Sequence, residues 1–272
     1  MVAASTVRIA IVHFPKEAVI GEAMLISVVT AVRNRCATIA ETLRSVAGQR
    51  HSDVEHLVID GQSTDGTCDV IKRHLRQGVV FVSEPDTGIY NALNKGVGRS
   101  SGDVIGFLHA DDLFASADVL SKVAEAFRDS SIEAVYGDLV YVSQADVGKV
   151  VRYWRAGNFS RRALTQGWMP PHPTLYVRRA VYSRIGGFDE TYRIAADYDS
   201  VLKIFGRDDV RCAYIPEVLV KMRLGGVSNR SLPNIFRKSL EDYRALRANR
   251  IGGLATLLAK NTSKIKQFVA SR

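Results

Sequence analysis

Cysteine is scarce in this sequence of 272 residues, which contains only Cys36, Cys68 and Cys212. An odd number of widely separated cysteines has neither the density of a disulfide-stapled secreted domain nor the paired spacing of a zinc site. We therefore expect three free thiols in a protein of a reducing compartment.

Long apolar runs are also missing. None approaches the ~20 residues that a helix needs to span a bilayer. The apolar stretch from Ile9 to Phe14 is too short for a secretory signal peptide, and no small-residue cleavage site follows it. We interpret residues 1–24 as a leader of uncertain structure.

Acidic residues are rare at the C-terminal end. From Arg230 onward, ten basic residues accompany only Glu241 and Asp242, so this end carries +8 of the formal net charge of +9. A basic end on a nearly neutral body indicates contact with an anionic surface and does not indicate a nucleic-acid-binding body.

Apolar residues recur at helical spacing within this basic end, at Phe236, Leu240, Tyr243, Leu254, Leu257 or Leu258, Ile265 and Phe268. Two interpretations stay open. The segment is an amphipathic helix pair that lies on an anionic membrane, or its apolar stripes pack on the rest of the protein.

The first half alternates short apolar runs with amphipathic patterns. Strands are predicted at 25–32, 54–59, 79–82 and 104–108, and helices at 39–47, 64–75, 89–97 and 119–127. This alternation favours an α/β fold with a doubly wound, mostly parallel sheet and right-handed crossovers.

The pattern changes after residue 133. Strands are predicted at 134–136 and 139–142 around a turn at Gly137-Asp138, at 174–177, and at 210–220 with an interruption at Pro216. Helices are predicted at 181–185, at 197–205, and from Pro233 onward with a break at Gly252-Gly253.

Carboxylates that directly follow a strand are the first candidates for chemistry, because ligands of open parallel sheets bind outside the carboxyl ends of the strands. Asp60 ends one strand and can accept hydrogen bonds from a base or ribose. The Ser63, Thr64 and Asp65 side chains that follow either cap the next helix or share this role.

Asp111 and Asp112 follow another buried strand. Two adjacent carboxylates repel each other unless a cation compensates them. Mg²⁺ or Mn²⁺, held by few carboxylates together with substrate phosphates, is the natural partner. The alternative is that the pair caps the helix beginning near Ser116.

Two more sites carry open interpretations. Asp197 and Asp199 begin a predicted helix, where the helix dipole favours carboxylates and where a general base could also lie. His172, between Pro171 and Pro173, is either structural or a metal ligand. No Walker-type phosphate loop, Gly-x-Ser-x-Gly elbow or His-Glu-x-x-His motif is present.

Four stretches, at 27–34, 58–67, 83–96 and 110–112, together resemble the family-two inverting glycosyltransferases of the GT-A fold. The resemblance is to bacterial enzymes of the colanic-acid type, which build surface polysaccharides and glycolipids, and it covers about residues 25–225. It implies transfer of a sugar from a UDP- or GDP-sugar donor to a glycan or lipid-linked acceptor.

The resemblance also implies residue roles. Asp111 and Asp112 fill the place of a DxD-type motif, here Ala-Asp-Asp, with Asp112 the ligand of Mn²⁺ or Mg²⁺. Asp197 matches the catalytic base and Asp199 is its rival. The nucleotide contacts are Thr30, Val32, Arg33 and Asp60, and the segment that frames the donor sugar includes Glu84, Asp86, Tyr90, Asn94 and Lys95.

We accordingly predict a catalytic domain at 25–228, with a nucleotide-sugar half at 25–115 and an acceptor half at 116–228, followed by a basic helical tail at 229–272. A lipid-linked acceptor favours the membrane interpretation of the tail, at the cytoplasmic face of the plasma membrane. A nucleotidyltransferase acting on sugar phosphates is an alternative, but the glycine-rich loop expected of it is missing from residues 30–36. The second alternative is a non-catalytic module that binds a nucleotide or a glycan.

Overall fold

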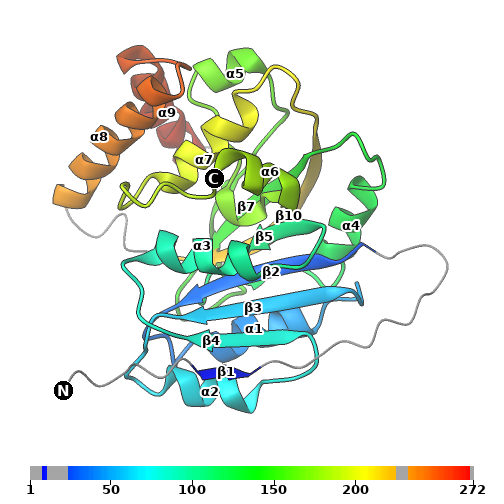
Figure 1. Cartoon of the computed structure of the whole chain (residues 1–272). Coiled ribbons are helices and arrows are strands. Elements are labelled where there is room, and N and C mark those ends of the chain that lie inside the picture. The colour runs from blue at the N-terminus through cyan, green and yellow to red at the C-terminus, as the bar shows by residue number, and fades with distance from the viewer. Residues whose placement is uncertain (1–7, 11–23, 225–231, 270–272) are drawn as a thin grey trace.

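The computed structural model describes residues 8–10, 24–224 and 232–269, and Figure 1 shows a twisted sheet with helices on both of its faces. Four strands form a parallel block in the spatial order β4-β3-β2-β5. They are β2 (Ile26–Val32), β3 (Val54–Asp60), β4 (Val79–Ser83) and β5 (Val104–Phe107). The predicted α/β fold with a parallel sheet is confirmed.

Helices cover this block because alternate strand residues face opposite sides. Val29, Leu57 and Ile59 pack with Leu93 of α3 on one face, whereas Val58 packs with Ile39 of α1 on the other. The helices that follow the four strands are α1 (Ile39–Ala47), α2 (Thr67–Arg73), α3 (Ile89–Arg99) and α4 (Val119–Ala126).

The order of the strands reverses between β2 and β5. β3 and β4 lie on one side of β2, and β5 lies on the other. The loops that leave β2 and β5 therefore diverge to opposite faces and border a crevice, the usual ligand site of an open α/β sheet.

The second half of the chain extends the sheet with mixed pairing. β9 (Tyr176–Arg178) is antiparallel to β5 and β7 (Ala134–Val142), and β10 (Cys212–Arg223) is parallel to β7. The pattern did not predict three short strands. They are β1 (Arg8–Ala10) beside β4, β6 (Leu113–Phe114) beside β10 and β8 (Val150–Trp154) beside β7.

The predicted turn at Gly137-Asp138 is wrong, because β7 runs through both residues. A Cβ atom on Gly137 would lie 2.5 Å from Cγ of Leu219, so the glycine lets β10 approach closely. Asp138 is buried, and its carboxylate accepts hydrogen bonds from the hydroxyls of Tyr153 and Tyr214. Long-range contacts thus override the local turn signal.

The remaining elements carry residues toward the site. The predicted interruption at Pro216 appears as register shifts in the pairing of β10 with β7, and the strand continues beyond it. The elements between β8 and β10 are α5 (Arg161–Thr165), a 3₁₀ helix (His172–Thr174), α6 (Arg179–Ile185) and α7 (Ala196–Phe205).

The tail forms α8 (Leu232–Ala248) and α9 (Leu254–Val269), with the predicted break at Gly252-Gly253 between them. Ala245 and Leu246 are buried against the body, whereas Phe236 is 75% and Leu240 59% exposed. The side chains of Ile265 and Phe268, and most of the predicted leader, lie outside the described residues. Among the helices that are described, none combines the length and apolarity needed to cross a membrane.

Candidate active site

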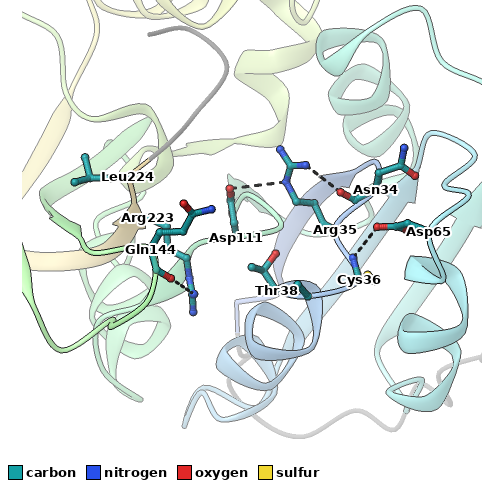
Figure 2. Close-up of a pocket in the computed structure, with 10 residues that line it drawn as sticks. Asn34, Arg35, Cys36, Thr38, Asp65, Asp111, Gln144, Arg223 and Leu224 are labelled. Carbon is teal, nitrogen blue, oxygen red and sulfur yellow. Dashed lines mark hydrogen bonds and ion pairs between the residues drawn. The ribbon is translucent and has the colours of Figure 1, made fainter. Parts of the chain in front are cut away.

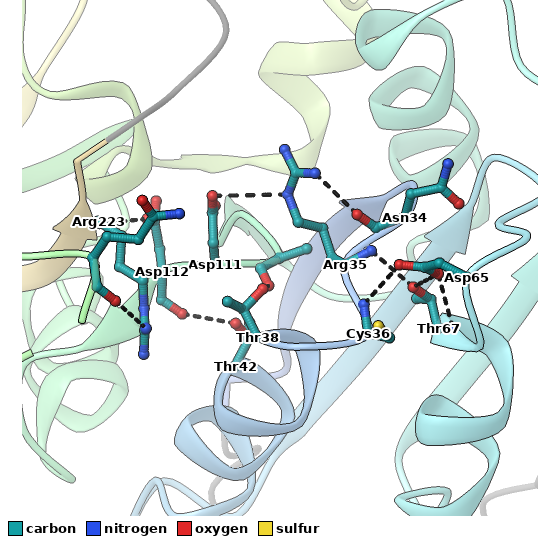
Figure 3. A network of polar contacts seen from close by, with 12 residues as sticks. Asn34, Arg35, Cys36, Thr38, Thr42, Asp65, Thr67, Asp111, Asp112 and Arg223 are labelled. Atoms are coloured by element: carbon teal, nitrogen blue, oxygen red, sulfur yellow. Dashed lines mark hydrogen bonds and ion pairs between the residues drawn. The ribbon is translucent and has the colours of Figure 1, made fainter. Parts of the chain in front are cut away.

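The loop that follows β5 is held in place by Thr38, which directly precedes α1, and by Thr42 within α1. The Thr38 hydroxyl donates to the carbonyl oxygen of Ala110 at 2.9 Å, and the Thr42 hydroxyl donates to that of Asp112 at 2.9 Å. Figure 3 shows this arrangement, with Asp111 and Asp112 beside the first turn of α1. The two aspartates therefore lie at the point where the strand order reverses.

The loops that follow β2 and β3 are joined as well. The backbone N–H of Asn34 donates to the Ser63 hydroxyl at 2.8 Å, and the N–H of Thr64 donates to Oδ1 of Asn34 at 2.9 Å. Asp65 accepts from the N–H of Cys36 at 3.1 Å and from that of Thr67 at 3.0 Å. The Ser63 to Asp65 stretch thus fastens two loops together, and Asp65 also accepts the first backbone N–H of α2, whose N-cap residue Gly66 has no side chain.

A cavity of about 230 Å³ opens between these loops and the end of β10 (Figure 2). Polar and apolar atoms contribute equally to its lining, which carries charges of both signs. The residues that line it are Asn34, Arg35, Cys36, Ala37, Thr38, Asp65, Asp111, Gln144, Arg223 and Leu224. Of these, the predicted site residues include Asp111, and Asp65 is one of the alternatives left open.

Arg35 and Arg223 are the cations of this cavity that the motifs did not reveal. Nε of Arg35 lies 3.9 Å from Oδ2 of Asp111. Arg223, at the end of β10, donates to Glu41 at 2.6 Å and to the carbonyl oxygen of Gln144 at 3.1 Å. Arg35 lies in the same loop as the predicted Arg33, whereas no local pattern marks Arg223.

Asp112 is 1% exposed, and its Oδ1 accepts the backbone N–H of Arg223 at 3.2 Å. Its Oδ2 is buried and finds no hydrogen-bond partner within the described chain. Burial and the neighbouring Asp111 raise the pKa of Asp112 well above its usual range. A buried carboxylate oxygen that lacks a donor is suited to accept a cation.

Asp60 lies at the end of β3 with its carboxylate fully buried. It accepts from the Ser83 hydroxyl at 2.7 Å and from the backbone N–H of Ser63 at 3.1 Å. A Cβ atom on the adjacent Gly61 would lie 2.0 Å from Oδ2 of Asp86. The structure therefore brings the predicted Asp60 and Asp86 together.

Other predicted residues are engaged with the protein itself. The Thr30 hydroxyl is buried and lies 2.9 Å from Nε2 of His56. Glu84 pairs with Lys95 at 3.3 Å and with Arg99 at 3.2 Å. Asn94 accepts from the backbone N–H of Phe188 at 2.8 Å and donates to its carbonyl at 2.9 Å, which ties α3 to the segment after α6.

Asp197 lies in the first turn of α7 and faces Tyr90. The Tyr90 hydroxyl lies 3.4 Å from Oδ1 of Asp197 and donates to the carbonyl of Ile194 at 2.6 Å. Burial, with the charge of Asp197, raises the pKa of Tyr90, so its hydroxyl stays protonated and can donate.

Asp199 is occupied elsewhere. It is 2% exposed, forms an ion pair with Lys203 at 2.8 Å and accepts from the side chain of Asn249, which directly follows α8, at 2.8 Å. This carboxylate therefore holds α7 to the end of α8. Asp197 is the better placed of the two for chemistry.

His172 is 5% exposed and stacks on Phe107 at 5.2 Å. Burial lowers the pKa of His172 to about 4, with Asp197 opposing and His109 adding to the shift. Its Nε2 has no hydrogen-bond partner in the described part of the chain, where no group of three His, Cys, Asp or Glu residues could hold a metal. Its role as a metal ligand stays a prediction.

Comparisons with known proteins identify the family of this chain. The profile of glycosyl transferase family 2 matches residues 27–186. The PGL/p-HBAD biosynthesis glycosyltransferase of Mycobacterium tuberculosis is 29% identical over 223 residues, covering 80% of this chain and 84% of that protein.

Solved structures share the fold at low identity. A mannosyltransferase from Pyrobaculum calidifontis in complex with GDP-Man and Mn²⁺ has a TM-score of 0.61 and 17% identity, covering 92% of this chain and 76% of that one. Residues 1–349 of S. aureus TarS with UDP-GlcNAc have a TM-score of 0.64 and 16% identity, covering 84% and 66%. In the longer TarS structure, this chain spans 39% of that protein.

The profile match extends over more than half of the chain, and the solved neighbours have the GT-A fold expected from the sequence. The chain therefore belongs to glycosyl transferase family 2 and is a glycosyltransferase.

Proposed function

We propose that this glycosyltransferase moves a sugar from a UDP- or GDP-sugar to a glycan or lipid-linked acceptor, with inversion at the anomeric carbon. The observation that carries the proposal is the cavity at the reversal of strand order, beside the buried, unpartnered Oδ2 of Asp112. The two structural neighbours are complexes with GDP-Man and with UDP-GlcNAc, which supports a nucleotide-sugar donor.

The nucleoside is proposed to lie against the loops that follow β2 and β3. Asp60, which is fixed by Ser83 and Ser63, and the loop residues Val32 and Arg33 are the proposed contacts. Thr30 belongs to the same set, although its hydroxyl already contacts His56. The donor sugar would face the segment that carries Glu84, Asp86, Tyr90, Asn94 and Lys95.

Asp112, with Asp111 beside it, is proposed to hold Mn²⁺ or Mg²⁺. The fit rests on the buried, donor-free oxygen of Asp112 and on the repulsion between two adjacent carboxylates. His172 is the proposed further ligand. When bound, the cation would stabilise negative charge on the departing diphosphate.

Asp197 is proposed to act as the general base. Its carboxylate takes the proton of an acceptor hydroxyl, whose oxygen forms a bond to the anomeric carbon. The bond from that carbon to the diphosphate oxygen breaks at the same time, and its electron pair leaves with the nucleoside diphosphate. A single displacement of this kind inverts the anomeric centre.

A glycolipid acceptor is supported by the name of the mycobacterial relative. It is also supported by exposed apolar side chains on the tail helices, at Ile235, Phe236, Leu240, Leu254 and Leu258. With the basic residues of the tail around them, these side chains are suited to the surface of an anionic bilayer. We propose peripheral binding to the cytoplasmic face of the plasma membrane.

The donor proposal is tested by incubating the protein with Mn²⁺ and a panel of UDP-, GDP- and dTDP-sugars, with and without a membrane-lipid extract. Release of nucleoside diphosphate that requires metal and is lost in Asp112→Asn supports the proposal. Asp69→Asn, which removes an exposed carboxylate on α2, is the matched control. Conversion of a nucleotide-sugar and added pyrophosphate into a nucleoside triphosphate and a sugar 1-phosphate would indicate a nucleotidyltransferase. No turnover of any donor would contradict the proposal.

The membrane proposal has its own test. The protein should float with vesicles of phosphatidylglycerol and phosphatidylcholine at low salt, and the variant Phe236→Ser/Leu240→Ser should float less. Equal flotation of both proteins, or none with either, would contradict it.

A further inference from the structure

Three successive backbone N–H groups converge on one side chain of the tail. Oε2 of Glu241, on α8, accepts from Ile194 at 2.8 Å, from Ala195 at 3.0 Å and from Arg193 at 3.1 Å. The three donors lie 46 to 48 residues earlier in the chain. They form the segment that directly precedes α7, which carries Asp197 in its first turn.

The same segment is held from its other side. The carbonyl oxygen of Ile194 accepts the Tyr90 hydroxyl of α3 at 2.6 Å, and that hydroxyl also lies 3.4 Å from Oδ1 of Asp197. α8 packs along α7, as Figure 1 shows. Residues 193–195 are therefore fixed between α3 of the nucleotide-sugar half and α8 of the tail.

A charged acceptor suits this place. Backbone N–H groups at the start of a helix have no partner within the helix, and hydrogen bonds to a carboxylate are stronger than those to a neutral oxygen. Because the carboxylate takes three consecutive donors, it fixes both the position and the direction in which the chain enters α7.

We propose that Glu241 is a positioning residue for Asp197, so that the tail contributes to catalysis as well as to membrane contact. The inference rests on the proposed function, in which Asp197 is the general base. Glu241 touches neither donor nor acceptor in this account. It acts by holding residues 193–195, and through them the carboxylate that receives the proton.

The test compares Glu241→Ala and Glu241→Gln with Asn249→Ala. The glutamine keeps the size of the side chain and one acceptor oxygen, and it carries the test if Glu241→Ala does not fold. Asn249 is the matched control, since it is another contact of the tail with α7, through Asp199, and its side chain bonds outside residues 193–195. The readouts are kcat, the donor KM and amide hydrogen exchange of a peptide that spans residues 193–195.

We expect Glu241→Ala to lower kcat about 10- to 100-fold, the effect of a slightly misplaced catalytic group, while the donor KM changes less than about twofold. In Glu241→Gln, kcat should fall only about threefold to tenfold, because the amide oxygen of the glutamine still accepts hydrogen bonds from residues 193–195. Exchange at residues 193–195 should accelerate in both variants, and Asn249→Ala should resemble the wild type in all three readouts.

An unchanged kcat in folded Glu241→Ala or Glu241→Gln would overturn the inference, as would equal losses in the Asn249→Ala control. Amide hydrogen exchange at residues 193–195 that is as slow in the Glu241 variants as in the wild type would overturn it as well. A wild-type protein that turns over no donor is a different outcome, because it contradicts the proposed function itself.

Discussion

The hydroxyl of Tyr90 on α3 lies 3.4 Å from Oδ1 of Asp197 on α7, a residue 107 positions later in the chain. The same hydroxyl donates to the carbonyl of Ile194 at 2.6 Å. The predicted nucleotide-sugar half and the predicted acceptor half thus meet at the proposed base. Tyr90 belongs to the segment expected to frame the donor sugar, yet its hydroxyl contacts residues of the predicted acceptor half.

Tyr90→Phe should lower kcat about fivefold while the donor KM stays nearly unchanged, because it removes one hydrogen bond of about 1 kcal/mol and keeps the aromatic ring. Steady-state kinetics with varied donor would check this. Tyr182→Phe is the matched control, since the buried Tyr182 hydroxyl has no hydrogen-bond partner among the described residues. Equal losses in the two variants would contradict a role for the contact with Asp197.

A buried ion pair ties the two tail helices together. Asp242 is 1% and Lys260 2% exposed, with 2.9 Å between Oδ1 and Nζ, and the ammonium of Lys260 lies 3.0 Å from the centre of the Tyr198 ring. Burial opposes ionisation of Asp242, but Lys260 and Lys238 hold its pKa below the usual range.

Asp242→Asn should lower the free energy of unfolding by about 3 to 5 kcal/mol, because it leaves the charge of Lys260 buried without its counter-charge. Urea unfolding measures this. Asp242→Leu/Lys260→Met should be much closer to the wild type, since it removes both charges. A double variant as unstable as the single one would show that packing, not charge, explains the loss.

His56 makes the fold sensitive to acid. It is buried beside Thr30, and burial, with a smaller effect of Arg76, lowers its pKa to about 3. Below pH 6.5 the unfolded chain binds a proton here that the folded chain does not bind. The contribution of neutral His56 to the free energy of unfolding is therefore fully present above about pH 6.5 and is lost as the pH falls toward 3.

From pH 7 to pH 5, the wild type should lose about 2 kcal/mol more of its free energy of unfolding than His56→Gln does. Urea unfolding of both proteins at the two pH values checks this. The comparison cancels the contributions of the other buried histidines. Parallel losses in the two proteins would show that His56 is not the source.

Gly61 provides the space for Asp86. A Cβ atom there would lie 2.0 Å from Oδ2 of Asp86, so Gly61→Ala must displace that carboxylate. We expect about a tenfold weaker nucleotide-sugar affinity in calorimetry, equivalent to 1.4 kcal/mol. Gly98→Ala, on α3 with no described atom within 4 Å of the new Cβ, is the control. Unchanged affinity in Gly61→Ala would separate Asp86 from the donor site.

Local sequence patterns predicted the parallel block and the carboxylates at its strand ends. Asp60 and Asp112 follow buried apolar runs. The order of the parallel strands then brings these two carboxylates to the same edge of the sheet. They did not predict the path of β7 through Gly137-Asp138, since only contacts with β8 and β10 explain it. Arg223 and Glu241 were also missed, because each reaches the site through tertiary packing and no neighbouring residue in sequence announces its role.

We propose that Asp197 accepts the proton of the acceptor hydroxyl in a metal-dependent transfer from a nucleotide-sugar. The most direct measurement is acceptor-dependent release of nucleoside diphosphate by Asp197→Asn, beside the wild type and Asp69→Asn. We expect kcat to fall at least about 100-fold in Asp197→Asn, with donor binding retained and Asp69→Asn fully active. Turnover by Asp197→Asn at the wild-type rate would show that Asp197 is not the general base.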